Sequence, residues 1–296
     1  MIARWLGYLA LFPLVGVPVF RALASHIPPA DDTVARDAMA RARRIGLAAA
    51  LLLIGAATLR LYLQAKAFSD PGTPVTADTL RLILDETAWG TGWKWQAGSA
   101  VLALVGFAAA PVTRFAWVLV WAGAIGSVIS SPLTGHAIEH AFGARLGVAL
   151  QALHLLGGAV WLGTLAVLMA SAYPATRGLP AERREVVLAS LVHRYSPLAL
   201  AGAGTAIAAG LVLAWTYLGW VGALVETGYG ISLLIKLALV GGVAVLGAHN
   251  WRRVRPALGA PPGAQRLRRS ASAELLLGTL LLAVTAVLVA LPAPAM

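Results

Sequence analysis

The sequence predicts an all-α protein, a polytopic membrane helix bundle with eight transmembrane helices. Hydrophobic residues make up 59% of the 296 positions and charged residues only 12%. The charges gather in a few short segments, and long apolar runs separate these segments. Because a helix rises about 1.5 Å per residue, about 20 apolar residues cross a hydrocarbon core about 30 Å thick. Composition and spacing therefore predict an integral membrane protein.

Eight apolar runs are long enough to cross a bilayer. The third and fourth runs meet at Pro111, which predicts a tight hairpin. We expect one membrane domain made of two halves, an N-terminal four-helix half (residues 1–143) and a C-terminal four-helix half (residues 144–296). The expected spans are residues 5–23, 44–63, 92–110, 112–130, 144–172, 195–217, 231–251 and 273–291.

The distribution of arginine predicts the orientation of the bundle. The connections after the first, fifth and seventh spans are rich in arginine, whereas the connection after the sixth has no basic residue. Cytoplasmic loops carry such an excess of basic residues, so both termini are predicted to lie on the periplasmic side. The same loops account for the net charge of +11, so the expected partner is membrane lipid and not nucleic acid.

The outer side carries a weak internal repeat. The residues Glu86-Thr87-x-Trp89-Gly90 recur 140 positions later, from Glu226 to Gly230, with tyrosine in place of tryptophan. Both copies directly precede an odd-numbered span, which is consistent with a parallel four-plus-four repeat of the helices. Chance similarity among interfacial aromatic residues is an equal alternative. Before the first copy, residues 76–87 have leucine and isoleucine at helical spacing, which predicts a short surface helix capped by Thr76 or Asp78.

The connection after the fourth span contains three candidate metal ligands. In the stretch TGHAIEHAFG, His136 and His140 are four residues apart with Glu139 between them. On a helix, residues at this spacing share one face with Cβ atoms about 6 Å apart. Imidazole and carboxylate ligands suit copper(II) or zinc. A pair of solvated loop histidines is the alternative interpretation.

Two further ionisable residues lie inside predicted spans. His154 stands about ten residues into the fifth span, among small residues that allow a neighbouring helix or a ligand to approach closely. Lys236 lies at a similar depth in the seventh span. Ionisable groups at such depths need a partner or a wet cavity, and hydrogen bonding to a neighbouring helix is the alternative role for His154. Glu274, near the start of the last span, is expected to pair with an arginine such as Arg269.

Several stretches of the second half resemble the copper resistance protein D (CopD) family of bacterial inner-membrane proteins. In chain order they are LTGHA at 133–137, HLLGGAVWLGTL at 154–165, RYSPLAL at 194–200, TGYGISLLIKLAL at 227–239, HNWRRVRP at 249–256 and LRRSASAE at 267–274.

This resemblance implies an eight-helix inner-membrane protein that binds copper ions and moves them from the periplasm toward the cytoplasm. It also implies a periplasmic copper-binding partner of the CopC type, and it places His136 and His154 at family positions. His140 and Glu139 are added from their spacing alone. Copper would be captured at His136, His140 and Glu139 and then passed to His154. No GxxxxGK[ST] stretch for ATP occurs, so transport is expected to be passive, gradient-coupled or driven by a partner.

Two other functions stay open at this point. In a membrane b-type cytochrome or quinone-linked oxidoreductase, His154 would be an axial ligand of haem. A non-transporting copper sensor or assembly factor would bind metal at His136 without any flux. The copper-transport hypothesis predicts a protein that is not an enzyme.

Overall fold

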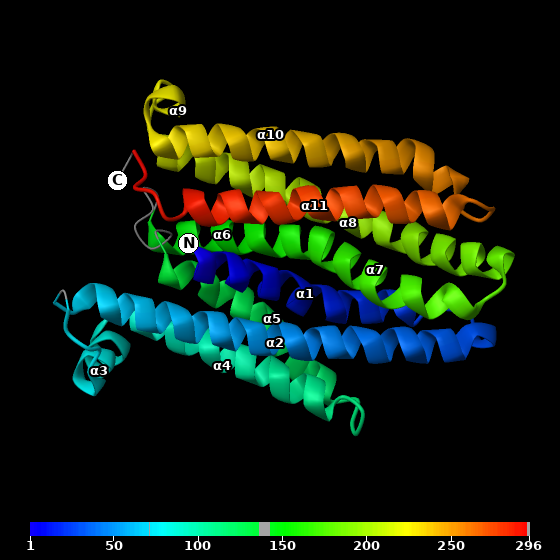
Figure 1. The fold of residues 1–296 in the computed structure, drawn as a ribbon, viewed down its shortest axis with the longest axis horizontal. Coiled ribbons are helices and arrows are strands. Elements are labelled where there is room, and N and C mark those ends of the chain that lie inside the picture. Colours follow the sequence, from blue (N-terminus) through cyan, green and yellow to red (C-terminus); the bar gives the residue numbers. More distant parts are fainter. Residues whose placement is uncertain (71, 136–142, 295–296) are drawn as a thin grey trace.

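Long helices that run roughly parallel to one another make up most of the chain (Figure 1). The computed structural model describes residues 1–70, 72–135 and 143–294, and these residues contain no strand. The all-α prediction is therefore confirmed. Both termini lie at the same end of the bundle as two short helices, α3 (Ala77–Glu86) and α9 (Ala223–Glu226). The long helical elements are α1 (Ile2–Ala24), α2 (Asp32–Phe68), α4 (Ala88–Ala109), α5 (Ala116–Ser130), α6 (Ala144–Gly158), α7 (Thr164–Ala175), α8 (Ala181–Leu218), α10 (Gly228–His249) and α11 (Gly263–Leu288).

Short helical segments extend several of these helices. The π-helical segment η4 (Ala159–Gly163) joins α6 and α7 into one rod, and the π-helical segment η6 (Asn250–Val254) extends α10. A 3₁₀ segment, η2 (Ser131–Thr134), follows α5. The remaining 3₁₀ segments are η1 (Pro29–Asp31), η5 (Thr176–Gly178) and η7 (Arg255–Ala257).

Seven helical rods of the described chain are long and apolar enough to cross a membrane. They correspond to seven of the eight predicted spans, so a multi-pass membrane protein is confirmed. The remaining predicted span, residues 92–110, corresponds to α4, which is not among the seven. Lys94 and Gln96 lower the mean hydropathy of this helix, although its 22 residues give it a length of about 33 Å. The count of eight stays a prediction.

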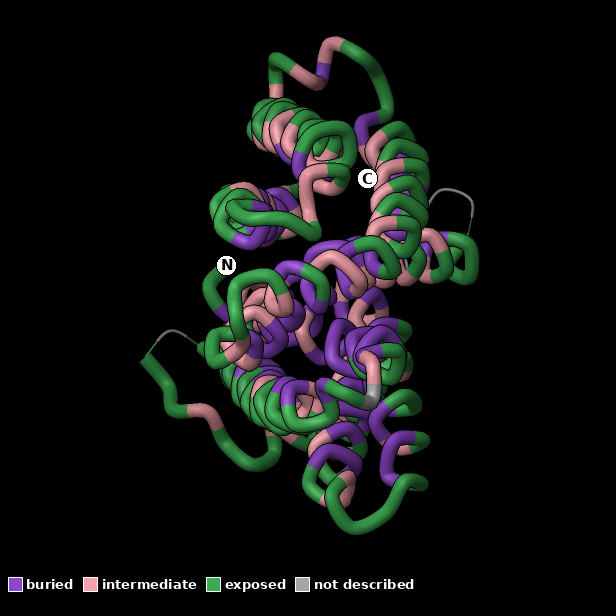
Figure 2. Tube along the Cα trace, turned by 90° about the vertical axis from the view of Figure 1, so that its right-hand side faces the viewer, coloured by how far each residue is buried: buried purple, intermediate pink, exposed green. Residues whose placement is uncertain are grey.

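The first helix lies at the centre of the bundle. α1 contacts α2, α5, α7, η4 and α11, and its Leu11, Leu14 and Phe20 side chains are almost fully buried. Figure 2 shows the buried residues concentrated along this central part of the molecule. Gly16 of α1 faces Gly163 of η4, and a Cβ atom on Gly16 would overlap with the backbone of Gly163. Small residues thus let the N-terminal helix contact the backbone of the second half directly.

A second close backbone contact joins α6 to α8. A Cβ atom on Gly202 would lie 2.7 Å from the carbonyl oxygen of Gly157, and one on Gly157 would lie 2.8 Å from the backbone nitrogen of Ala206. Real Cβ atoms do not approach this closely. Glycine at both positions therefore sets the distance between the two helices that carry the site described below.

The repeated residues form the same local structure in both halves. Thr87 and Thr227 are the N-caps of α4 and α10, which each contain 22 residues and start 140 positions apart. The Thr87 hydroxyl accepts a hydrogen bond from the Gly90 backbone N–H at 2.9 Å, and Thr227 accepts one from Gly230 at 3.0 Å. The local repeat is therefore structural, whereas the wider four-plus-four repeat stays a prediction.

The predicted short helix before the first repeat is confirmed. It is α3, and of the two proposed caps Thr76 is the one used, since its side chain accepts a hydrogen bond from the Thr79 backbone N–H at 3.2 Å.

The glycine contact between α6 and α8 gives a stability prediction. We expect Gly202→Ala to lower the free energy of unfolding by about 1–3 kcal/mol, because the added methyl group overpacks a backbone contact. The matched control is Gly204→Ala on the same helix, where a Cβ atom would meet nothing within 4 Å. We expect this control to change stability by less than about 1 kcal/mol. Thermal unfolding of the detergent-purified variants measures both effects, and equal midpoints would show that the close contact does not limit stability.

Candidate functional site

His154 lies half-buried on α6, at the contact with α8. Its Nδ1 is 2.6 Å from the backbone carbonyl oxygen of Ala206. Because a carbonyl oxygen can only accept, Nδ1 carries the proton and donates this bond. In the neutral imidazole with this tautomer, Nε2 carries the lone pair that can bind a ligand.

Gly210 of α8 lies directly beside this imidazole ring. A Cβ atom at position 210 would lie 2.8 Å from Cε1 and 2.9 Å from Nδ1 of His154. The absence of a side chain at Gly210 thus leaves room for the ring in its hydrogen-bonded orientation. Gly202, Ala206 and Gly210 are spaced four residues apart, so one face of α8 both contacts α6 and positions the histidine.

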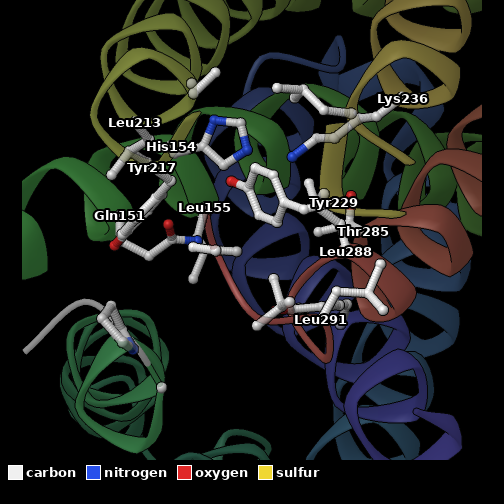
Figure 3. Close-up of a pocket in the computed structure, with 18 of the residues that line it drawn as sticks. Gln151, His154, Leu155, Leu213, Tyr217, Tyr229, Lys236, Thr285, Leu288 and Leu291 are labelled. Atoms are coloured by element: carbon white, nitrogen blue, oxygen red, sulfur yellow. The ribbon is translucent and has the colours of Figure 1, made fainter. Parts of the chain in front are cut away.

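The imidazole lines a cavity of about 100 Å³ between α6, α8, α10 and α11. Lys236 and Tyr229 of α10 line this cavity, and Figure 3 shows their side chains pointing toward the His154 ring. Gln151 lines it one helical turn before His154, on the side of the α6 N-terminus. A second cavity of about 100 Å³ continues past His154 and Lys236 to Trp161. No carboxylate among the described residues lines either cavity.

The three candidate ligands of the preceding connection lie outside the described residues. These are His136, Glu139 and His140. Three residues just before them, Ser131, Pro132 and Gly135, line the same cavity as His154. Within the described part of the chain, no group of three or more His, Asp or Glu side chains could hold a metal ion. Of the four predicted ligands, the structure thus places only His154, in a cavity that the chain leading to the other three also lines.

A buried carboxylate forms a second polar centre deeper in the bundle. The predicted pair of Glu274 with Arg269 is wrong. The Glu274 carboxylate instead accepts hydrogen bonds from Trp161 Nε1 at 2.8 Å and from Asn250 Nδ2 at 2.9 Å. In the sequence, Glu274 stands out as one acidic residue in the last apolar run. Its neutral partners, Trp161 and Asn250, lie on other helical segments, 113 and 24 positions away.

A third polar cluster lies in the first half and was not predicted. Arg60 of α2 donates hydrogen bonds to the Thr134 carbonyl oxygen at 3.0 Å and to the Thr134 hydroxyl at 2.8 Å. Its other neighbours include Gln96 of α4 and the ring of Trp89. The sequence feature that could have indicated this cluster is Arg60 itself, a basic residue inside the predicted span 44–63. Gln96 and Trp89 precede Lys236 and Tyr229 by 140 positions, which is the offset of the local repeat.

The family-like stretches of the second half converge on these cavities. His154 and Trp161 belong to one stretch, Tyr229 and Lys236 to another, and Asn250 to a third. Glu274 ends a fourth. The residues that carry the resemblance are thus separated in the sequence and gathered around one interior region.

Comparisons with known proteins find two family models and a curated relative. Residues 1–148 match the family model described as "Copper resistance protein D-like, N-terminal domain", and residues 189–288 match "Copper resistance protein D". The copper transport protein CutJ of Bacillus subtilis (strain 168) is 30% identical over 266 residues, which cover 86% of this chain and 46% of that protein. The chain thus spans about half the length of this curated relative. No solved structure matches.

The hydrogen bond from Trp161 to Glu274 gives a second stability prediction. We expect Trp161→Phe to destabilise the protein by about 1–3 kcal/mol, because one oxygen of a buried carboxylate loses its donor. Trp220→Phe is the control, since Trp220 is 52% exposed. The cost should shrink in a Glu274→Gln background, where the buried charge is absent. An equal cost of Trp161→Phe in both backgrounds would contradict the proposed interaction.

Proposed function

Because this chain belongs to the copper resistance protein D family, we propose that it carries copper across the membrane through the cavity that contains His154. The family is a copper-resistance family and the curated relative is a copper transport protein; neither is an enzyme. One observation carries the proposal: His154 presents a free imidazole nitrogen to a cavity inside a bundle of membrane-spanning helices.

The chemistry of this nitrogen suits a copper ion. Imidazole is a common ligand of copper, and the hydrogen bond from Nδ1 to the Ala206 carbonyl fixes the tautomer and orients the ring. The cavity of about 100 Å³ is lined mainly by apolar side chains. The cavity would therefore admit copper only after most of its hydration shell has been replaced by protein ligands.

Haem binding has less support from the same geometry. Bis-histidine haem ligation requires a second axial ligand at matching depth and space for a large macrocycle. Among the described residues, no histidine other than His154 lines either cavity. The cavity volume favours a small ion.

The outer capture site in this proposal consists of His136, His140 and Glu139. Its support is the position of the preceding residues, Ser131, Pro132 and Gly135, along the wall of the His154 cavity. Copper released from these ligands would enter at Gln151 and reach His154 one helical turn further in. A periplasmic CopC-type protein is the proposed donor.

The proposed setting is the bacterial inner membrane. We place the termini, α3 and α9 on the periplasmic side and the arginine-rich ends of the helices in the cytoplasm, as the distribution of basic residues favours. In this arrangement α4 is the eighth spanning helix, since it packs against α2 and α5 along the bundle. Copper then moves from periplasm to cytoplasm.

The central test is His154→Ala. We expect copper entry into proteoliposomes that contain the purified protein to fall by about tenfold or more, since even the loss of a ligand's hydrogen-bond partner lowers metal affinity by about 10- to 100-fold. The control is His193→Ala, since His193 makes a comparable bond from Nδ1 to a backbone carbonyl but is exposed on α8. Unchanged entry at equal protein level would remove His154 from the route. Copper binding without entry in the wild type would favour the sensor or assembly factor.

The outer ligands give a kinetic prediction. We expect the double variant His136→Ala, His140→Ala to slow copper entry at low external copper and to approach the wild-type rate at saturating copper, because a capture site sets the apparent affinity. His26→Ala, at an exposed position, is the control. A lower maximal rate with unchanged half-saturation would assign the two histidines to a later step.

A further inference from the structure

Glu274 is an acidic side chain inside the bundle for which the copper route provides no role. It is 5% exposed on α11. Its only described partners are neutral N–H groups, Trp161 Nε1 and Asn250 Nδ2. No ion pair joins it to a described lysine, arginine or histidine. Burying a carboxylate is costly unless a cation or a proton neutralises it.

Two buried polar atoms of the described residues around Glu274 have no hydrogen-bond partner, Asn250 Oδ1 and Arg255 Nε. Asn250 turns its amide nitrogen to the carboxylate, and its Oδ1 is buried without a partner. The Trp161 carbonyl oxygen already accepts the Tyr195 hydroxyl at 2.9 Å, so Tyr195 offers no donor to this centre. A carboxylate has about four acceptor positions, of which two are used here. No described positive group pairs with the carboxylate to neutralise it.

Both partners of Glu274 come from π-helical segments. Trp161 belongs to η4 and Asn250 to η6, and these are the two π-helical segments in the described chain. Such segments are rare and are frequently found at functional sites. Each segment places one hydrogen-bond donor, Trp161 or Asn250, against the same carboxylate. The two donors are about 90 residues apart in the sequence. This convergence distinguishes Glu274 from an incidental buried acid.

A crevice of about 490 Å³ gives access to the carboxylate. It runs between α8, α10 and α11, and its lining includes Glu274, Asn250, Trp161 and Tyr195. Gly247 of α10 also lines it, and a Cβ atom there would meet nothing within 4 Å. The position 140 residues earlier is Phe107, which fills the contact between α2 and α4 against Gly46. The second half is thus open where the first half is closed.

Besides Glu274, three described titratable or charged side chains line this crevice. Tyr195 faces it from α8, and Arg252 and Arg255 face it from η6 and η7. The Arg255 guanidinium stacks on Trp251, 4.2 Å from the ring centroid. Neither arginine forms an ion pair with Glu274 within the described structure. The carboxylate therefore remains available to an entering cation.

We propose that Glu274 and Asn250 form a binding site for a hard monovalent cation, a proton or Na⁺, separate from the copper route at His154. Carboxylate and amide oxygens suit hard cations such as Na⁺, whereas the imidazole nitrogen of His154 suits copper. The described residues supply few oxygens, which favours the proton because it needs only one lone pair. Binding neutralises the buried charge, and its coupling to copper movement rests on the function proposed above.

The site itself is tested without copper. The Trp161 indole donates to the Glu274 carboxylate, so we expect its emission to shift when a cation binds. The measurement is the tryptophan emission of purified protein in nanodiscs, titrated with acid at fixed Na⁺ and with Na⁺ at fixed pH. We expect acid to shift the emission of the wild type and Trp161→Phe to remove that shift. Glu274→Gln should remove it as well. This variant keeps an acceptor for Trp161 and can offer an amide to Asn250, so it should remain folded.

Glu182→Gln is the matched control, since Glu182 is exposed on α8. A shift with Na⁺ alone identifies sodium as the cation. If neither titration distinguishes the wild type from Glu274→Gln, the site does not exist and the inference is overturned, whether or not the protein transports copper.

Coupling is tested by copper entry into proteoliposomes under an imposed gradient of the cation identified. We expect the gradient to change the entry rate of the wild type and of Glu182→Gln, but not that of Glu274→Gln. An equal response in Glu274→Gln would overturn the coupling. Absence of copper entry in every variant, with the emission shift intact, would instead reject the proposed transport function and leave the cation site standing.

Discussion

The site depends on the close approach of α6 and α8 at Gly157 and Gly202. With these backbones in contact, the carbonyl oxygen of Ala206 lies within hydrogen-bond distance of His154, one turn further along α8. Gly210, one turn beyond, leaves room for the ring. A larger side chain at any of these positions would separate the helices or move the imidazole. The orientation of one histidine thus follows from a stripe of small residues, in an apolar environment where the association of helices is favoured by packing rather than by the hydrophobic effect.

Three polar groups inside the bundle are held between helical segments by their hydrogen bonds. His154 bonds across α6 and α8, Arg60 bonds from α2 to η2, and Glu274 bonds to both η4 and η6. Unpaired polar groups are costly in such an interior, so these bonds fix which helix faces meet. Lys236 and the carboxylate of Glu274 form no ion pair within the described residues. These two residues border the spaces through which we propose that ions move.

The two helices that share the threonine cap, α4 and α10, differ in how closely they are packed. α4 and α10 have the same length and the same threonine cap, 140 positions apart. In the first half, Trp93 donates a hydrogen bond to Ala57 at 2.7 Å and Phe107 packs on Gly46, so α4 is closely packed against α2. The positions 140 residues later in α10 are Leu233, which is buried, and Gly247, which lines the crevice beside Glu274. A glycine thus lines the crevice at the position 140 residues after Phe107, which fills a contact between helices in the first half.

The sequence by itself determined the class of the protein, the approximate limits of its helices and the family. These properties follow from the length and polarity of local segments and from motifs that are contiguous in the chain. It also singled out His154, because an ionisable residue in an apolar run stands out without any knowledge of its neighbours. The predicted partner of Glu274 was wrong for the converse reason. Trp161, Asn250 and Glu274 are separated by about 90 and 24 positions, and only helix packing decides which side chains meet. The cavity, the tautomer of His154 and the crevice beside Gly247 were likewise decided by tertiary structure, because each results from contacts between helices that local sequence does not encode.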